Sequence, residues 1–169
     1  MYSPTDKEKF ISLLEGNKAL LYKVANSYCR NAEDRKDLVQ EIILQLWRSF
    51  EKYDDQYKLS TWMYRIALNV AISFYRKQRI RREADAPITE SMVFIADEPA
   101  GEELESNLNL LRQFIDELKE LDKALMILYL EESSYKEIAE ILGITETNVA
   151  SKINRIKEKL KQKFKNINQ

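Results

Sequence analysis

Apolar residues recur every three or four positions between residues 10 and 50, which is the spacing of one face of a helix. The pattern predicts a first helix that Gly16-Asn17 ends and a second helix over residues 21–28. A third helix is expected to begin at Asn31, because acidic residues follow it in the first turn, where the helix dipole favours them. Its apolar positions cover a broad arc, so we expect this third helix to be central in a helical bundle.

A fourth helix is predicted from Thr61 to about Arg82, with Ser60 or Thr61 as its N-cap. At 100° per residue, one stripe is apolar and is expected to face the core: Met63, Ile66, Ala67, Val70 and Phe74. A second face mixes an indole, an amide, a hydroxyl and two guanidinium groups: Trp62, Arg65, Asn69, Ser73 and Arg76. Aromatic and amide groups beside a basic track suit single-stranded nucleic acid, whose bases stack on rings while cations follow its backbone. The same face is also compatible with a half-buried tryptophan and a solvated helix end.

Residues 86–106 interrupt the helical pattern. They contain six acidic residues, no Lys or Arg, and two of the three prolines of the chain. Such a segment buries too little apolar surface to offset the entropy of ordering. The predicted fold is therefore all-α, with two small helical domains, residues 1–85 and 107–169, joined by a flexible acidic linker over residues 86–106.

The segment from Tyr135 to Val149 has the residue spacing of a helix-turn-helix. Ala139 is small where two helices cross, and Gly143 supplies the positive φ that ends the first helix. Thr145 is the expected N-cap of the second helix. One face of that helix is polar and basic: Asn148, Ser151, Lys152, Arg155 and Lys159. In such motifs the second helix enters the major groove of DNA, although a helical hairpin with a solvated charged face would have the same spacing.

The net charge of −1 conceals an uneven distribution of charge along the 169 residues. Residues 1–85 hold 16 basic and 12 acidic side chains, whereas residues 107–146 hold four basic and nine acidic ones. Residues 147–169 hold seven basic side chains and one acidic one. A protein that binds a polyanion can be neutral overall if its basic residues gather where the polyanion lies.

The composition excludes several classes of function. There is no His, and Cys29 is the only cysteine, which excludes His- or multi-Cys-ligated zinc, a Ser-His-Asp or Cys-His catalytic pair, and an intramolecular disulfide. No cofactor or small-molecule substrate is expected, and the acid pair Asp54-Asp55 has the character of a solvated turn. No apolar run approaches the ~18–20 residues of a membrane span, and the amino terminus lacks a signal-peptide pattern, so we expect a cytoplasmic protein.

Three motifs occur together, and their order is informative: Asp37-Leu-Val-Gln40-Glu41, then Leu59-Ser-Thr-Trp62-Met-Tyr-Arg65-Ile-Ala-Leu-Asn69, and after the acidic segment Tyr135-Lys-Glu-Ile-Ala-Glu-Ile-Leu-Gly-Ile-Thr145. With these motifs the chain resembles a bacterial RNA polymerase sigma factor of the extracytoplasmic-function (ECF) class of the sigma-70 family. The resemblance covers about residues 10–165. It implies a non-enzymatic factor that binds RNA polymerase core and promoter DNA, and it makes an anti-sigma factor a further candidate partner.

The resemblance also implies roles for single residues. The surface for the β′ clamp helices of the polymerase would be formed by Asp37, Gln40, Glu41, Ile43 and Leu44, while the second domain would meet the β flap. The melted minus-ten strand would be held by Ser60, Thr61, Trp62, Arg65, Asn69, Ser73, Arg76 and Lys77. In that set Asn69 would line a flipped-base pocket, and Arg76 and Lys77 would meet phosphates. The minus-thirty-five duplex would be read by Thr145, Asn148, Ser151, Lys152, Arg155 and Lys159.

Two other functions remain compatible with an all-α chain of this kind. A conventional helix-turn-helix regulator would bind duplex DNA without polymerase core, but it gives the Trp62–Asn69 face no purpose. A helical adaptor or inhibitor that binds only proteins would have no affinity for nucleic acid despite its basic carboxy-terminal helix.

Overall fold

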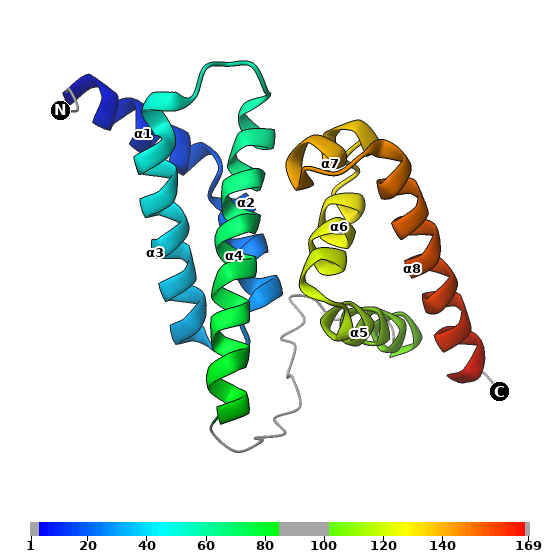
Figure 1. The fold of residues 1–169 in the computed structure, drawn as a ribbon. Helices are drawn as coiled ribbons and strands as arrows, with labels where there is room; N and C mark the ends of the chain where they lie inside the picture. Colours follow the sequence, from blue (N-terminus) through cyan, green and yellow to red (C-terminus); the bar gives the residue numbers. More distant parts are fainter. Residues whose placement is uncertain (1–3, 85–101, 168–169) are drawn as a thin grey trace. The chain divides into compact units, whose positions relative to one another are not determined.

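The computed structural model describes residues 4–84 and 102–167, and every regular element within those ranges is helical (Figure 1). The prediction of an all-α fold is therefore confirmed. The chain divides into two compact units, Met1–Pro87 and Ile88–Gln169. No helix among the described residues is both long enough and apolar enough to cross a lipid bilayer.

Within residues 4–84, the first unit has four α-helices and one short 3-10 turn: α1 (Pro4–Gly16), α2 (Lys18–Tyr28), α3 (Ala32–Ser49), η1 (Phe50–Lys52) and α4 (Leu59–Ala84). Helices α3 and α4 run antiparallel beside each other, joined by the loop after η1 (Figure 1), and α2 packs against both. The core is formed by side chains that are almost completely buried: Leu21, Val24, Leu38, Ile42, Leu46, Met63, Ala67, Leu68 and Ala71.

Local signals explain why the first helices begin and end where they do. Helix α1 ends at Gly16, and the Asn17 side-chain amide donates to the carbonyl oxygen of Leu13 at 2.9 Å. Helix α3 begins after Asn31, whose side-chain oxygen accepts a hydrogen bond from the backbone N–H of Asp34 at 2.7 Å. This satisfies one of the free N–H groups of the first turn, so the predicted start of the third helix is confirmed.

Helix α4 differs from the prediction in two respects. It begins at Leu59, and the backbone N–H of Trp62 already donates to the carbonyl of Lys58, so neither Ser60 nor Thr61 is its N-cap. The buried stripe is also rotated. Because α4 packs against both α2 and α3, its core positions include Tyr64, Leu68 and Ala71 beside the predicted Met63 and Ala67, whereas the predicted Ile66, Val70 and Phe74 are only half-buried.

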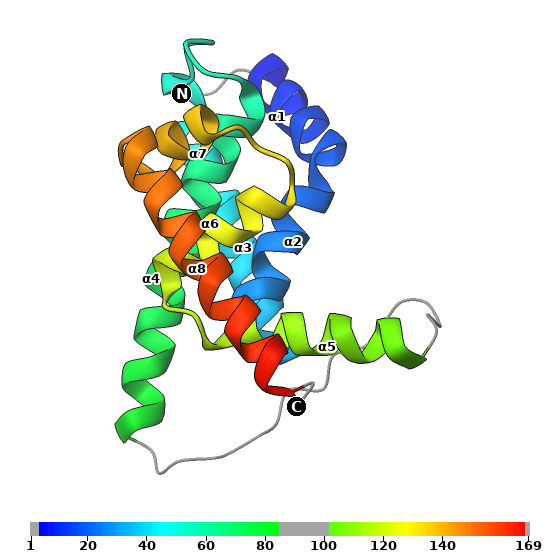
Figure 2. The ribbon, with the colours of Figure 1, turned by 90° about the vertical axis from the view of Figure 1, so that its right-hand side faces the viewer.

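The second unit contains α5 (Glu102–Glu117), α6 (Glu120–Leu130), α7 (Tyr135–Leu142) and α8 (Glu146–Ile167). Figure 2 shows α8 running from α7 past α6 toward α5. The core of this second unit is formed by Leu125, Leu128, Ile138, Val149, Ile153 and Ile156. Residues 102–106, which the sequence analysis assigns to the linker, form the start of α5, because three acidic residues in this first turn are stabilised by the helix dipole. Residues 86–101 of the predicted linker lie outside the described residues.

The α7–α8 hairpin has the geometry predicted for a helix-turn-helix. Gly143 ends α7 with φ of +70°, and its N–H and that of Ile144 both donate to the carbonyl of Ala139, at 2.9 and 3.2 Å. The Thr145 hydroxyl accepts from the N–H of Asn148 at 3.1 Å and so caps α8. Val149 is completely buried. The predicted roles of Gly143 and Thr145 in the turn are therefore confirmed.

Candidate nucleic-acid and protein interfaces

Helix α3 presents a polar row on the side opposite its buried residues. The side chains of Asp37, Gln40 and Glu41 are exposed. Leu44 has 40% of its surface accessible to solvent, and Ile43 is half-buried. Gln45 donates a hydrogen bond to Glu41 at 3.3 Å. The predicted protein-binding residues thus share one helix, and an acidic rim with an exposed leucine can meet a partner helix that carries both basic and apolar side chains.

Helix α4 exposes most of the predicted nucleic-acid residues. The exposed members are Arg65, Asn69, Ser73, Arg76 and Lys77, together with Ser60 in the first turn. Thr61 does not belong to this face: only 5% of its surface is accessible, so its side chain packs inside the unit. The exposed face offers amide, hydroxyl and cationic groups side by side, which can hydrogen-bond a base and pair with phosphates.

A groove joins these two helices. It has a volume of about 650 Å³, and from α3 it is lined by Asp37, Glu41, Gln45 and Ser49 at successive turns. From α4 it is lined by Ile66, Asn69, Val70, Ser73, Phe74, Lys77, Gln78 and Arg81. The half-buried Ile66, Val70 and Phe74 therefore supply apolar surface to the groove, between an acidic wall and a basic one. The structure brings Asp37 and Glu41 to the same groove as Asn69, Ser73 and Lys77, although they are some 30 residues apart in the sequence.

The loop before α4 contributes an aromatic residue that the sequence analysis missed. The ring of Tyr53 lies 4.9 Å from that of Trp62, tilted by 39°, and the Tyr53 hydroxyl donates to the carbonyl of Tyr57 at 3.2 Å. Partial burial, and then the Asp55 carboxylate, raise the pKa of Tyr53, so the phenol stays neutral. The tyrosine fixes Trp62, which is half-buried. The only sequence signal was the pair of tyrosines, Tyr53 and Tyr57, in an otherwise polar loop.

Helix α8 carries the predicted duplex-binding residues of the second unit. Asn148, Ser151, Arg155 and Lys159 are exposed, at intervals of three or four residues, and so form one continuous row. Thr145 is exposed, and its hydroxyl is engaged as the N-cap. Lys152 is different from the rest of this set: it is half-buried, and its ammonium lies 3.8 Å from the carboxylate of Asp122 in α6.

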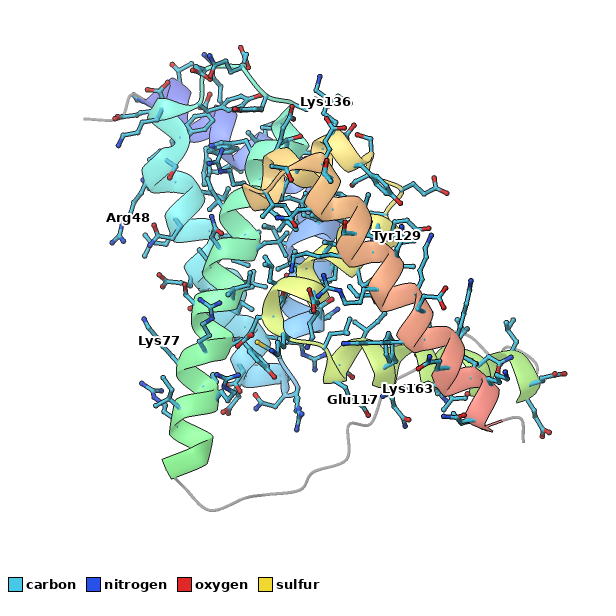
Figure 3. All side chains as sticks on the ribbon, turned by 45° about the vertical axis from the view of Figure 1, so that its right-hand side comes forward. Arg48, Lys77, Glu117, Tyr129, Lys136 and Lys163 are labelled. Carbon is cyan, nitrogen blue, oxygen red and sulfur yellow. The ribbon has the colours of Figure 1, made fainter. Side chains whose placement is uncertain are left out.

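Two further lysines of α8 contact aromatic rings of the same unit. The Lys157 ammonium lies 4.5 Å from the centre of the Tyr129 ring, and its hydrogen bond with Tyr129 raises the pKa of Lys157. Lys163 lies 5.1 Å from the centre of the Phe114 ring and pairs with Glu117, as Figure 3 shows near the end of α8. Three lysines of α8 therefore contact α5 or α6 (Lys152, Lys157 and Lys163), whereas Arg155 and Lys159 lie in the exposed row.

One helical unit has a polar and basic face along a long helix and the other has a helix-turn-helix, an arrangement suited to a protein that contacts nucleic acid at two separate surfaces. Residues 13–81 match the family model "Sigma-70 region 2", and residues 108–160 match "Sigma-70, region 4". The chain belongs to the sigma-70 family of RNA polymerase sigma factors, in the ECF class.

Individual relatives agree with this membership. The chain is 31% identical to "RNA polymerase sigma factor SigV" of Bacillus subtilis, over 89% of this chain and 88% of the relative. It is 28% identical to "ECF RNA polymerase sigma factor SigW" of the same organism, over 96% and 92% of the two chains. Among solved structures, the sigma factor RpoE of Bartonella quintana, crystallised with the anti-sigma factor NepR, superposes with a TM-score of 0.68. That match covers 94% of this chain and 96% of the other at 20% identity, and it supports the fold. The predicted family is confirmed, and the alternative of a conventional helix-turn-helix regulator is not favoured.

Proposed function

We propose that this chain directs RNA polymerase core to a specific set of promoters and has no bond chemistry of its own. The observation that supports the proposal is that a sigma-70 family chain presents two exposed polar and basic faces, one on α4 and one on α8, on separate units. A factor of this kind places two surfaces on two promoter elements and stabilises the melted strand between them. Its place of action is the cytoplasm, where promoter DNA and polymerase core occur.

In this proposal each surface has one role. The α3 row of Asp37, Gln40, Glu41, Ile43 and Leu44 docks on the β′ clamp helices of the polymerase. The α4 face of Ser60, Trp62, Arg65, Asn69, Ser73, Arg76 and Lys77 captures the non-template strand of the minus-ten element. The α8 row of Asn148, Ser151, Arg155 and Lys159 enters the major groove of the minus-thirty-five element, and the second unit also meets the β flap.

The energetic role of the α4 face follows from the cost of opening DNA. Separating and unstacking a base pair costs a few kcal/mol, and each base that stacks on an aromatic ring recovers about 1–3 kcal/mol. Trp62, backed by Tyr53, supplies such a ring, and the Asn69 amide offers a donor and an acceptor to the edge of an extruded base. The basic side chains that follow on α4 neutralise the phosphates of the same strand.

Run-off transcription tests the proposal directly. Purified core polymerase from the same organism is given a library of genomic promoter fragments, with or without this protein. Transcripts that begin at defined sites only when the protein is present are the expected result, and their upstream sequences give both recognition elements. If the protein neither starts transcripts nor binds core polymerase, the proposal is wrong, and duplex binding by the protein alone then supports the conventional regulator.

An anti-sigma factor is the second class of partner that we propose. The solved relative RpoE is crystallised with the anti-sigma factor NepR. A protein that covers the groove between α3 and α4 would interfere with polymerase docking and strand capture together, because members of both sets line it, Asp37 and Glu41 from one and Asn69, Ser73 and Lys77 from the other. Co-purification of the chain from its own cells, followed by release of transcription activity from the complex, tests this partner.

A further inference from the structure

The ion pair between Lys152 in α8 and Asp122 in α6 separates Lys152 from the other predicted duplex-binding residues of its helix. The two charged groups are 3.8 Å apart, and their side chains are only 24% and 27% exposed. Asp122 lies in the first turn of α6, where the helix dipole stabilises a carboxylate. The packing of α8 therefore holds Lys152 in place, and the first turn of α6 holds Asp122.

The position of Lys152 along α8 explains its inward direction. It comes three residues after Val149 and four before Ile156, both of which are buried, so it borders the buried stripe of the helix. The exposed row consists of Asn148, Ser151, Arg155 and Lys159. A phosphate that approached Lys152 would have to displace the Asp122 carboxylate and would be repelled by it at short distance.

We propose that Asp122 is a positioning residue that keeps Lys152 out of the DNA interface, so that α8 contacts the promoter duplex through the exposed row alone. The inference rests on the proposed function, because it assumes that the second unit binds a promoter. It also makes the proposed function more specific, because it excludes Lys152 from the residues of α8 that contact DNA. Lys152 then helps to dock α8 on α6, and the base preference of the minus-thirty-five element follows from Asn148, Ser151 and Arg155.

Salt dependence of promoter binding separates a lysine that meets a phosphate from one that does not. The affinity of the holoenzyme, assembled from this full chain and core polymerase, is measured on one promoter duplex at 50 and 200 mM salt. The higher salt concentration weakens binding by a certain factor, and each phosphate contact contributes about 3.5-fold to that factor. A variant that has lost one phosphate contact should therefore show a factor about 3.5 times smaller than wild type. We expect that shrinkage for K159Q and no change for K152Q. A shrinkage for K152Q equal to that for K159Q would overturn the proposal.

A double-mutant cycle tests the role of Asp122. D122N frees Lys152, so the fold-loss between the two salt concentrations should grow by about 3.5-fold, and D122N/K152Q should return to the wild-type value. D122E keeps the charge and should behave as wild type. If D122N leaves the salt dependence unchanged, or if D122N/K152Q retains the increase, Asp122 does not act through Lys152 and the proposal is wrong.

Two controls keep this test independent of folding and of the proposed function. Thermal unfolding of each variant identifies any loss of the second unit, and the K159Q variant shows that one lost contact is measurable. Run-off transcription with the wild-type chain is done in parallel. Absence of transcripts there contradicts the proposed function, whereas normal transcription with a flattened salt dependence for K152Q contradicts only the inference about Asp122.

Discussion

Asn69 is the residue whose replacement distinguishes strand capture from polymerase docking most clearly. Its amide is exposed on α4, and the residue lines the groove shared with α3. We expect Asn69→Ala to lower the rate of promoter opening about tenfold, the effect of losing one base contact of ~1–3 kcal/mol, and to leave core binding unchanged. Opening is measured by the fluorescence of a 2-aminopurine base in the minus-ten element, and core binding by gel filtration.

A matched control for this prediction is Asn26→Ala, which removes an exposed amide from α2 of the same unit. That variant should open the promoter at the wild-type rate. Equal loss of core binding and of opening in Asn69→Ala would place Asn69 in the polymerase interface and contradict its assignment to the DNA strand.

Tyr53 provides a second test at the scale of the residue, because its ring supports Trp62. Tyr53→Phe keeps the ring contact and loses the hydrogen bond to the Tyr57 carbonyl, whereas Tyr53→Ala loses both. We expect Tyr53→Ala to weaken binding of a single-stranded minus-ten oligonucleotide by the holoenzyme about threefold to tenfold, because stacking on a mobile indole costs side-chain entropy. Tyr53→Phe should bind nearly as well as wild type. An equal loss in both variants would mean that the hydroxyl, and not the ring, supports Trp62.

At the scale of the element, Gly143 determines how α7 and α8 are joined. A Cβ atom added there would meet no atom within 4 Å, so a substitution is resisted only by the backbone φ of +70°. Gly143→Ala should therefore destabilise the helix-turn-helix by about 1 kcal/mol, as measured by chemical denaturation. Gly16→Ala is the matched control, since Gly16 ends α1 without positive φ and also has open space around it. Its stability should be unchanged or slightly higher.

The elements also show how much the sequence alone could predict. The helix-turn-helix was predictable to single residues, because its turn depends on local features such as the φ of Gly143 and the Thr145 cap. The start of α4 and the rotation of its buried stripe were not, because they depend on packing against α2 and α3. The sequence analysis groups Lys152 with the exposed residues of α8, although its spacing from Val149 and Ile156 puts it at the border of the buried stripe. Only the tertiary fold shows that Asp122 lies beside it.

At the scale of the whole molecule, each of the two units concentrates basic residues in one of its helices. The densest group of basic residues in the first unit lies in the carboxy-terminal half of α4, and most basic residues of the second unit lie in α8, while the overall charge stays at −1. Steering toward DNA depends on local charge, so a nearly neutral chain can present two basic faces.

The division into two units predicts that each one unfolds by itself. Ile42 and Ile153 are completely buried in separate cores, and truncation of such a side chain to Ala costs about 2–5 kcal/mol. Hydrogen exchange followed by mass spectrometry on the full chain should show lost protection in residues 4–84 only for Ile42→Ala, and in residues 102–167 only for Ile153→Ala. Each variant is the control for the other. Loss of protection in both units from one substitution would mean that they unfold as one cooperative body. The two surfaces that we propose for DNA binding could then not adjust independently to the spacing of two promoter elements.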